Sequence, residues 1–586
     1  MLSLLALWAI LGITFTFVGM PILYVCNGHI CLQKAEDRIF TAIWLGIIVL
    51  ANLLLLASLF TALTGYITAL FVAIMLLPHF FKRYEIFAAR PSINFMAGVL
   101  VMVTCLVAAL AAIMSSGTPE DSGAYHIQMI AWLVDYGTVP GVALINNHFG
   151  FVSSWFALQA PLKSEWLHNH FVIGMNSFIF FMMIALAVIK LNRVSYRNAD
   201  ISDWFVIIYS ALFCNFFFSG LIFSPSPDLP GTLLIVVTTW LIIALTANKN
   251  EATDGLSRSG LAVLILASGA VSIKFGTLPL LGMAAIYYIF SNGFSFRKAW
   301  MALAIIAPFI GIHLLVSTIT SGCPLYPAPY LCTDLPWSLG SENARKMTAE
   351  IFEFAKWVGP APTDADGFNW LWHKPPNNNV FNDKPLMLGL LIINVSCGMG
   401  LYLMRTKYNK AAIFYTALIA LSGIAFTLTT APHLRFGLGF FLIAPALVIA
   451  LFLMAATQTL FKNITRLSKI MALLAFLALG YSVLPIIRFY LPDTQSTQAM
   501  LGLADDWVAL PWPPIEVQHL ELVTGNNFFY NVSANRYGAP GLCLDAPLPC
   551  APGRIDNVWL RDESAGLKKG FVIKEIFVSK LSNGAH

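Results

Sequence analysis

The chain has 586 residues, of which 58% are hydrophobic and only 11% are charged. A soluble protein needs more charge on its surface, so this composition excludes a soluble domain and predicts a polytopic membrane protein. The net charge of +5 does not indicate nucleic-acid binding, because the basic residues fall in short segments between apolar runs.

Apolar runs of membrane-spanning length recur along the chain and predict an all-α protein with about 13–14 transmembrane helices. The run 260–290 is interpreted as two short helices, because Lys274 and Gly276 interrupt it. The other predicted spans lie near 3–23, 40–60, 65–81, 93–114, 167–189, 204–223, 230–247, 299–319, 385–404, 411–430, 434–456 and 469–490.

Basic residues set the predicted topology. Segments such as the one containing Lys190, Arg193 and Arg197 fall between alternate spans, and such segments favour the cytoplasmic side. Three longer segments, 115–166, 320–384 and 491–586, then face outward. The last has the short strand-like stretches and turns of a small extracytoplasmic domain.

The first outward segment reads "SSGTPEDSGAYHIQMIAWLVDYGTVPG" from Ser115 to Gly141. Its apolar spacing from Tyr125 to Tyr136 predicts a helix along the membrane surface. Asp121 would be the N-cap of that helix, a contact worth ~1 kcal/mol. The cap leaves the neighbouring Glu120 unexplained. The functional alternative is a general base, since a carboxylate held ionised at the bilayer edge can accept a proton from a hydroxyl group.

A second surface helix is expected at 146–162, where aromatic residues suit a lipid anchor. His148 and its asparagine neighbours in this segment could contact a polar substrate. The histidines of the loop, including His126, do not have the spacing of a metal site. A divalent cation (Mg²⁺ or Mn²⁺) that bridges Asp121 and a lipid phosphate stays open.

Three further charged residues border apolar runs. Asp228, in "SPSPDLP", either caps the following helix or faces the same side as Asp121. Lys274, in "AVSIKFGTLPL", must be paired or line a cavity, because a charge in that context is costly. Arg435, in "TTAPHLRFGLGF", is either a snorkelling side chain or a second cation of the same site. Together these charges suit a lipid that carries phosphate.

Cysteine spacing agrees in part with this topology. Cys323 with Cys332, and Cys543 with Cys550, are close pairs in outward segments, where disulfides can persist. Cys26 and Cys31 have similar spacing but fall on the cytoplasmic side, so their pairing is left open.

These features together resemble the C-type (GT-C) integral-membrane glycosyltransferases. "DSGAYHIQMIAWLVDYGTVPGVALINNHFGFVSSWF", "SPSPD", "KFGTLPL", "CPLYPAPY", "APHLRFG" and "LDAPLPCAP" are similar to motifs of a poorly characterised bacterial branch of that superfamily. The likeness covers roughly 93–586. It implies additional N-terminal transmembrane helices (1–92), a GT-C-like core (93–490) and a small extracytoplasmic domain (491–586).

The resemblance implies an enzyme that moves a sugar from a polyprenyl-phosphate donor to an acceptor hydroxyl, with inversion. It places this enzyme in the bacterial inner membrane with its site facing the periplasm. The acceptor is a glycan, a lipid or a protein. Asp121 would be the general base, with Glu120 as the alternative base or a metal ligand. The donor phosphate would contact Lys274 and Arg435, and the substrate would contact Asp228, Tyr125, His126 and His148.

Two alternatives share these charges. A transporter or flippase for a lipid-linked glycan predicts repeat symmetry and charges deep in the bilayer. A polymerase or ligase that moves whole glycan chains would use arginines, not a loop acid, as its main groups.

Overall fold

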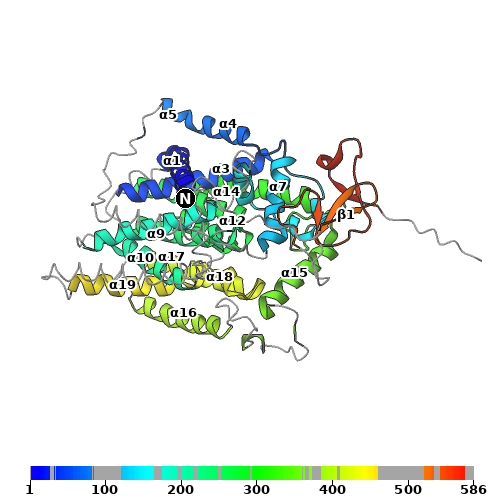
Figure 1. The fold of residues 1–586 in the computed structure, drawn as a ribbon. Helices are drawn as coiled ribbons and strands as arrows, with labels where there is room; N and C mark the ends of the chain where they lie inside the picture. Colours follow the sequence, from blue (N-terminus) through cyan, green and yellow to red (C-terminus); the bar gives the residue numbers. More distant parts are fainter. Residues whose placement is uncertain are drawn as a thin grey trace, which may run out of the picture.

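Long apolar helices lie side by side in a computed structural model of the chain (Figure 1). The structure describes residues 2–26, 32, 34–81, 84, 121–163, 174–195, 199–216, 221–222, 224–247, 253–290, 293–358, 361–362, 369–372, 384–404, 410–459, 520–533 and 542–574. Within these residues, eight helices are long and apolar enough to cross a membrane, and four shorter apolar helices accompany them. The protein is therefore a multi-pass, mainly helical membrane protein, as its composition predicts.

The spanning helices follow the predicted apolar runs. The long ones are α1 (Leu2–Val25), α3 (Ala35–Ala57), α9 (Gly174–Ser195), α11 (Asp228–Ala247), α14 (Phe296–Ser321), α16 (Lys384–Met404), α17 (Lys410–Thr430) and the consecutive pair α18 (Leu434–Phe441) and α19 (Ile443–Thr459). The shorter ones are α4 (Gly65–Leu76) with α5 (Pro78–Phe81), α10 (Ile201–Phe216), α12 (Thr253–Ile273) and α13 (Leu278–Phe290). The predicted spans 93–114 and 469–490 lie outside the described residues.

The predicted break in the run 260–290 is present. Lys274 has extended backbone angles, φ −146° and ψ 115°, and it separates α12 from a short 3-10 turn that leads into α13. The predicted span 434–456 is also divided, because α18 ends at Phe441 and α19 begins at Ile443. The break after α12 places one of the charged side chains described below, that of Lys274.

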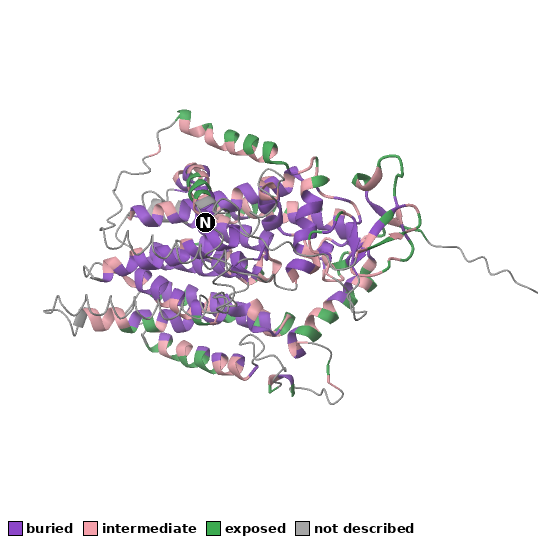
Figure 2. Ribbon diagram, in the orientation of Figure 1, coloured by how far each residue is buried: buried purple, intermediate pink, exposed green. Residues whose placement is uncertain are grey.

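The membrane-spanning part of α11 is buried throughout, whereas α4, α14 and α16 expose much of their length. Figure 2 shows this exposure along α4 and α16, at opposite edges of the bundle. The N-terminal helices also pack closely. A Cβ atom on Gly19 of α1 would lie 1.8 Å from the carbonyl oxygen of Ala42 in α3. Small residues permit such close backbone approach between membrane helices. Because α3 also packs on α12, the boundary predicted at residue 92 is not visible in the packing and stays a prediction.

The non-spanning segments gather at one end of the bundle, called here the loop end (Figure 1). They comprise a π-helical turn (Ser122–His126), α7 (Ile127–Asp135), α8 (Ser154–Gln159), α15 (Gly340–Trp357), the strands β1 (Leu520–Thr524), β2 (Phe529–Ser533), β3 (Cys550–Ala551), β4 (Val558–Leu560) and β5 (Phe571–Ile573), and 3-10 turns at Val142–Leu144, Asn147–Gly150, Ala160–Leu162, Asn369–Leu371 and Gly566–Lys569.

The strands form a small C-terminal unit on the loop end. β1 and β2 pair antiparallel, β3 adds in parallel to β2, and β4 pairs antiparallel with β5. The unit is tied to the bundle by hydrogen bonds from the amide of Phe571 to the carbonyl of Pro140 and from that of Ile573 to that of Pro336. This unit lies at the loop end (Figure 1), and the outward placement of residues 491–586 stays a prediction.

The two helices predicted on the membrane surface are instead buried, so that prediction is wrong. Trp132 in α7 is 1% exposed, and Trp155 and Phe156 in α8 are almost fully covered. Ser153, the N-cap of α8, donates to the carbonyl of Ile273 at the end of α12. Aromatic residues at helical spacing bury equally well against lipid or protein, and here the neighbouring helices and the C-terminal unit cover them.

Candidate functional site

Four charged side chains from distant parts of the sequence meet at the loop end. The guanidinium of Arg435 donates from Nη2 to Oδ2 of Asp121 at 2.6 Å and from Nε to Oδ2 of Asp228 at 2.5 Å. The ammonium group of Lys274 donates to the other oxygen of Asp228 at 2.5 Å. The structure thus brings together all four residues that the sequence singles out as a base, a second acid and two cations.

Asp228, Lys274 and Arg435 each lie at or next to the end of a helix, and Asp121 is helical itself. Asp121 directly precedes the π-helical turn, and Asp228 is the first residue of α11. Lys274 occupies the break after α12, with its aliphatic stem against Gly231, where a Cβ atom would lie 3.3 Å from that of Lys274. Arg435 is the second residue of α18. Helix ends at one level of a bundle allow charged side chains to meet while the apolar spans stay in the membrane.

Asp121 is not a helix cap, contrary to the simpler prediction. Its backbone angles, φ −57° and ψ −33°, are helical, and its side chain makes no capping hydrogen bond. Its carboxylate contacts Arg435 instead. The charge of Asp121 therefore serves a contact between segments and not the local helix.

The four charges differ in exposure. The side chain of Asp228 is 8% exposed, those of Arg435 and Lys274 are 18% and 21% exposed, and that of Asp121 is 42% exposed. Asp228 is thus an inner carboxylate that joins the two cations, whereas Asp121 is the outer one. Lys274 also lies 4.7 Å from the ring centre of Phe436, a cation–π distance.

A set of buried polar side chains fixes the turn that leads into Asp228. Ser122 and Ser224 share a hydrogen bond of 2.6 Å, and Asn176 donates to the carbonyls of Leu221 and Ser226 at 2.9 Å. Trp155 in turn donates to Asn176 at 2.8 Å. Since buried polar groups are costly unless satisfied, this network determines where the turn lies. It also links the residue after Asp121 to the turn before Asp228.

Tyr125, His126 and His148, predicted to contact substrate, lie beside the cluster. The ring of Tyr125 stacks on that of His148 with centroids 5.2 Å apart and meets that of His126 edge-on at 4.2 Å. Burial lowers the pKa of His126 to about 4, against the opposing effect of Asp121 and Asp228, so this imidazole is neutral at pH 7. Burial likewise raises the pKa of Tyr125, and both carboxylates add to that effect.

His433 belongs to the same surroundings and was missed from the sequence. Its Nδ1 accepts a hydrogen bond from the backbone amide of Arg435 at 3.2 Å, so His433 caps α18. Burial lowers its pKa well below the usual value, and the nearby charges of Lys384 and Arg435 add to this shift. The only signal was its place in "APHLRFG", since histidine is not among the preferred cap residues.

Lys384, the first residue of α16, was missed too. It is 1% exposed and donates to the carbonyls of Ala355 in α15 and Pro432. Among the residues described, no salt bridge includes it. Lys384 therefore joins the end of α15 to the turn that precedes Arg435. From the sequence, it is indistinguishable from a lysine that snorkels at the edge of a span.

Glu120 lies outside the described residues, so its relation to the cluster stays a prediction. No group of three or more His, Cys, Asp or Glu side chains in the described part of the chain could hold a metal ion. Both carboxylates of the cluster are bound by Arg435. These residues do not fit a divalent cation, and we derive no step that uses one.

A second ionic cluster lies at the opposite end of the bundle. Lys190 is fully buried in α9 and pairs with Asp37 of α3 and, at 2.7 Å, with Asp203 of α10. Lys34 bonds Asp203 at 2.8 Å, and Arg193 bonds Glu36 at 2.6 Å. Lys190 and Arg193 were interpreted as loop residues that set topology. They instead lie within a helix and join three spans.

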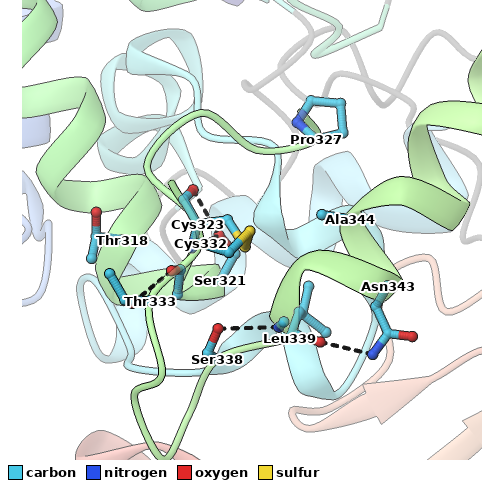
Figure 3. Close-up of a disulfide and its surroundings, with 12 residues drawn as sticks. Thr318, Ser321, Cys323, Pro327, Cys332, Thr333, Ser338, Leu339, Asn343 and Ala344 are labelled. Carbon is cyan, nitrogen blue, oxygen red and sulfur yellow. Dashed lines mark hydrogen bonds between the residues drawn. A yellow bond between two sulfur atoms is a disulfide. The ribbon is translucent and has the colours of Figure 1, made fainter. Parts of the chain in front are cut away.

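Both predicted cysteine pairs are disulfide-bonded. Cys323–Cys332 closes the turn between the end of α14 and the start of α15, where Thr333 donates its amide proton to Gly322 at 2.9 Å (Figure 3). Cys543–Cys550 closes a loop of the C-terminal unit. Cys26 is a buried free thiol, and Cys31 lies outside the described residues.

The fold and the cluster define a multi-pass membrane protein with a polar, ion-paired site at one end of its bundle. A family model described as a domain of unknown function (DUF8201) matches residues 1–442, so the chain belongs to this family. No curated protein and no solved structure matches the chain. The matched region includes all four residues of the cluster and the N-terminal helices, and it ends before the C-terminal unit.

Proposed function

We propose that this protein is a C-type glycosyltransferase that moves a sugar from a polyprenyl-phosphate donor to an acceptor hydroxyl. The observation that carries the proposal is the chain of ion pairs Asp121–Arg435–Asp228–Lys274 at one end of the bundle. It combines an accessible carboxylate with two cations, the groups that a reaction on a phosphate-linked sugar requires. The resemblance of the motifs supplies the substrate class.

In the proposed step, the acceptor oxygen attacks the anomeric carbon of the donor as its proton passes to Asp121. The bond between the anomeric carbon and the phosphate oxygen breaks, and its electron pair leaves on the phosphate. Arg435 and Lys274 stabilise the charge that develops there. Inversion follows from the single in-line displacement, and a phosphate leaving group needs no general acid.

For Asp228, which the sequence predicts to contact substrate, we propose a positioning role. Both of its carboxylate oxygens are bound by the two cations. It therefore holds Arg435 and Lys274 in place instead of contacting the sugar. Because it offsets part of their charge, the cations keep a fixed geometry without substrate, and preorganised charges of this kind lower the barrier without reorganisation. Asp121 is the acid left to accept the proton.

The site would face the periplasm of a bacterial inner membrane. The loop end holds the two disulfides and the C-terminal unit, and disulfides persist in an oxidising compartment. The polyprenyl chain of the donor would lie among the lipids beside the bundle. The acceptor would be a glycan, a lipid or a protein.

The test uses the purified protein in lipid vesicles with a panel of polyprenyl-phosphate monosaccharides and candidate acceptors. Asp121→Asn should abolish transfer and leave binding of polyprenyl phosphate intact, because the amide cannot accept the proton. The matched control is Asp135→Asn, an exposed acid at the end of α7 outside the cluster. Full activity of Asp121→Asn would refute the base role. Movement of the lipid across the membrane without transfer would favour the flippase alternative.

A further inference from the structure

The C-terminal unit reaches the turn that carries Asp121. Within the loop closed by Cys543 and Cys550, the amide of Leu544 donates to the carbonyl of Gly123 at 2.8 Å. The side-chain amide of Gln128, one helical turn further along, donates to the carbonyls of Leu544 and Ala546 at 2.9 Å each. Three hydrogen bonds thus connect one disulfide loop to residues 123–128.

The turn that accepts these contacts is unusual. Residues Ser122–His126 are π-helical, and the amide of Ile127 bonds the carbonyl of Ser122 five residues earlier. Single π-helical turns are rare and are found frequently at functional sites. Gln128 is fully buried, so the two bonds of its side-chain amide have no competition from water. The disulfide loop supplies the hydrogen bonds that contact this turn from outside its own helix.

The loop itself adopts a constrained conformation at the point of contact. Leu544 has a φ of +46°, in the left-handed region that residues other than glycine rarely adopt. Its side chain lies against Gly123, where an added Cβ would be 2.4 Å from Cδ2 of Leu544. Such a conformation persists only when its surroundings hold it in place. The leucine side chain therefore packs against a glycine, where any larger residue would clash with it.

We propose that the loop 543–550 is a positioning element that sets the Asp121 carboxylate against Arg435, with Gln128 and Leu544 as its positioning residues. Asp121 immediately precedes the supported turn, so a shift of the turn displaces its carboxylate from the guanidinium. The catalytic meaning of this placement rests on the proposed function, whereas the placement itself does not. The C-terminal unit, which lies beyond the family match, would thus complete a site whose charged residues all lie within the match.

Two substrate-free measurements test the proposal on the full-length protein in nanodiscs. Hydrogen exchange reports the turn through the amides of residues 121–128, and carbodiimide labelling with glycine ethyl ester reports the Asp121 carboxylate. Gln128→Met removes both side-chain hydrogen bonds and keeps the length of the side chain. It should speed exchange at 121–128 by about tenfold, and labelling of Asp121 should rise as its pair with Arg435 weakens. Protection of α11 and α17 should not change.

Leu544→Gly is the second variant, because glycine accepts the positive φ and only the side-chain contact is lost. It should increase both hydrogen exchange at 121–128 and labelling of Asp121, but by less than Gln128→Met does. The matched control is Arg554→Gln, which breaks an exposed pair with Glu521 in the same unit and should shift neither readout. If Gln128→Met does not fold, Leu544→Gly decides the question.

Wild-type exchange at 121–128 and wild-type labelling of Asp121 in both variants would overturn the proposal. So would an equal loss of protection in α11 and α17, because it would indicate a general effect on stability. If the vesicle assay detects transfer, Gln128→Met should lower kcat and leave KM for the donor unchanged. If the wild-type protein transfers no sugar, the proposed function fails, while both measurements still decide the positioning role.

Discussion

Asp228→Asn tests whether the two carboxylates of the cluster, Asp228 and Asp121, have different roles. The substitution keeps the shape of the side chain and removes the charge that Lys274 and Arg435 share. Asparagine has one oxygen, so at most one of the two cations keeps an acceptor, and the amide group points its protons at the other. The variant leaves two cations side by side without the carboxylate between them.

The expected loss of unfolding free energy follows from how exposed the paired side chains are. The side chain of Asp228 is 8% exposed and its two partners are about one-fifth exposed. Removal of one partner from a buried ion pair costs about 3–5 kcal/mol of unfolding free energy. The pair between Arg435 and Asp121 is more open, since Asp121 is 42% exposed. Loss of such a pair costs about 1 kcal/mol or less, so Asp121→Asn should be nearly as stable as the wild type.

The assay is thermal unfolding of both variants in the same detergent, together with binding of polyprenyl phosphate. We expect a large fall in stability and in affinity for Asp228→Asn, and a small change in both for Asp121→Asn. Equal destabilisation by the two substitutions would refute the distinction between an inner, structural carboxylate and an outer, reactive one. So would an Asp228→Asn protein with wild-type stability.

Three further predictions concern residues outside the four charged residues of the site. Lys384→Met should raise hydrogen exchange at the end of α15 with little effect elsewhere, because two carbonyls lose their donor. The pKa of His126, about 4 against an ordinary 6.5, means that the unfolded chain takes up a proton first as the pH falls. The unfolding free energy therefore loses nothing from His126 above pH 6.5, and it falls by about 3 kcal/mol by pH 4. Thermal unfolding of His126→Gln should consequently depend less on pH than that of the wild type. Lys190→Met should lower the unfolding free energy by about 3–5 kcal/mol and leave polyprenyl-phosphate binding unchanged, since Lys190 lies at the opposite end of the bundle.

The separation of the two ionic clusters bears on the transporter alternative. Asp228 begins α11, and Lys190 lies 5.7 Å from the ring centre of Trp240 in the same helix. Twelve residues of helix correspond to about 18 Å. Among the residues described, no salt bridge links the two clusters. The transporter alternative predicts charges deep in the bilayer, whereas these ion pairs lie at the two ends of apolar spans. This arrangement favours a functional site at one face and a structural ion-pair cluster at the other.

Some features of this protein could be predicted from the sequence because they depend on local chemistry. Apolar runs locate the spans, since membrane helices need about 20 such residues. A lysine at position 274 in an apolar run indicates a break or a partner, because an isolated charge there is too costly. Arg435 was selected as a second charge beside an apolar run, whereas Asp121 and Asp228 were selected as acids at the predicted starts of helices. Close cysteine pairs in long polar segments likewise predict the two disulfides.

Tertiary structure decided what these residues contact. Asp121 and Arg435 are 314 positions apart and Asp228 and Arg435 are 207 apart, so no local pattern reports their pairing. Burial of α7 and α8 was also invisible, because lipid and protein interiors are equally apolar and the same aromatic stripe suits both. From the sequence, Lys190 is indistinguishable from a loop residue that sets topology, because its acidic partners lie on two other helices. The sequence determines which groups need a partner, and only the packing of the helices determines which partner each of them finds.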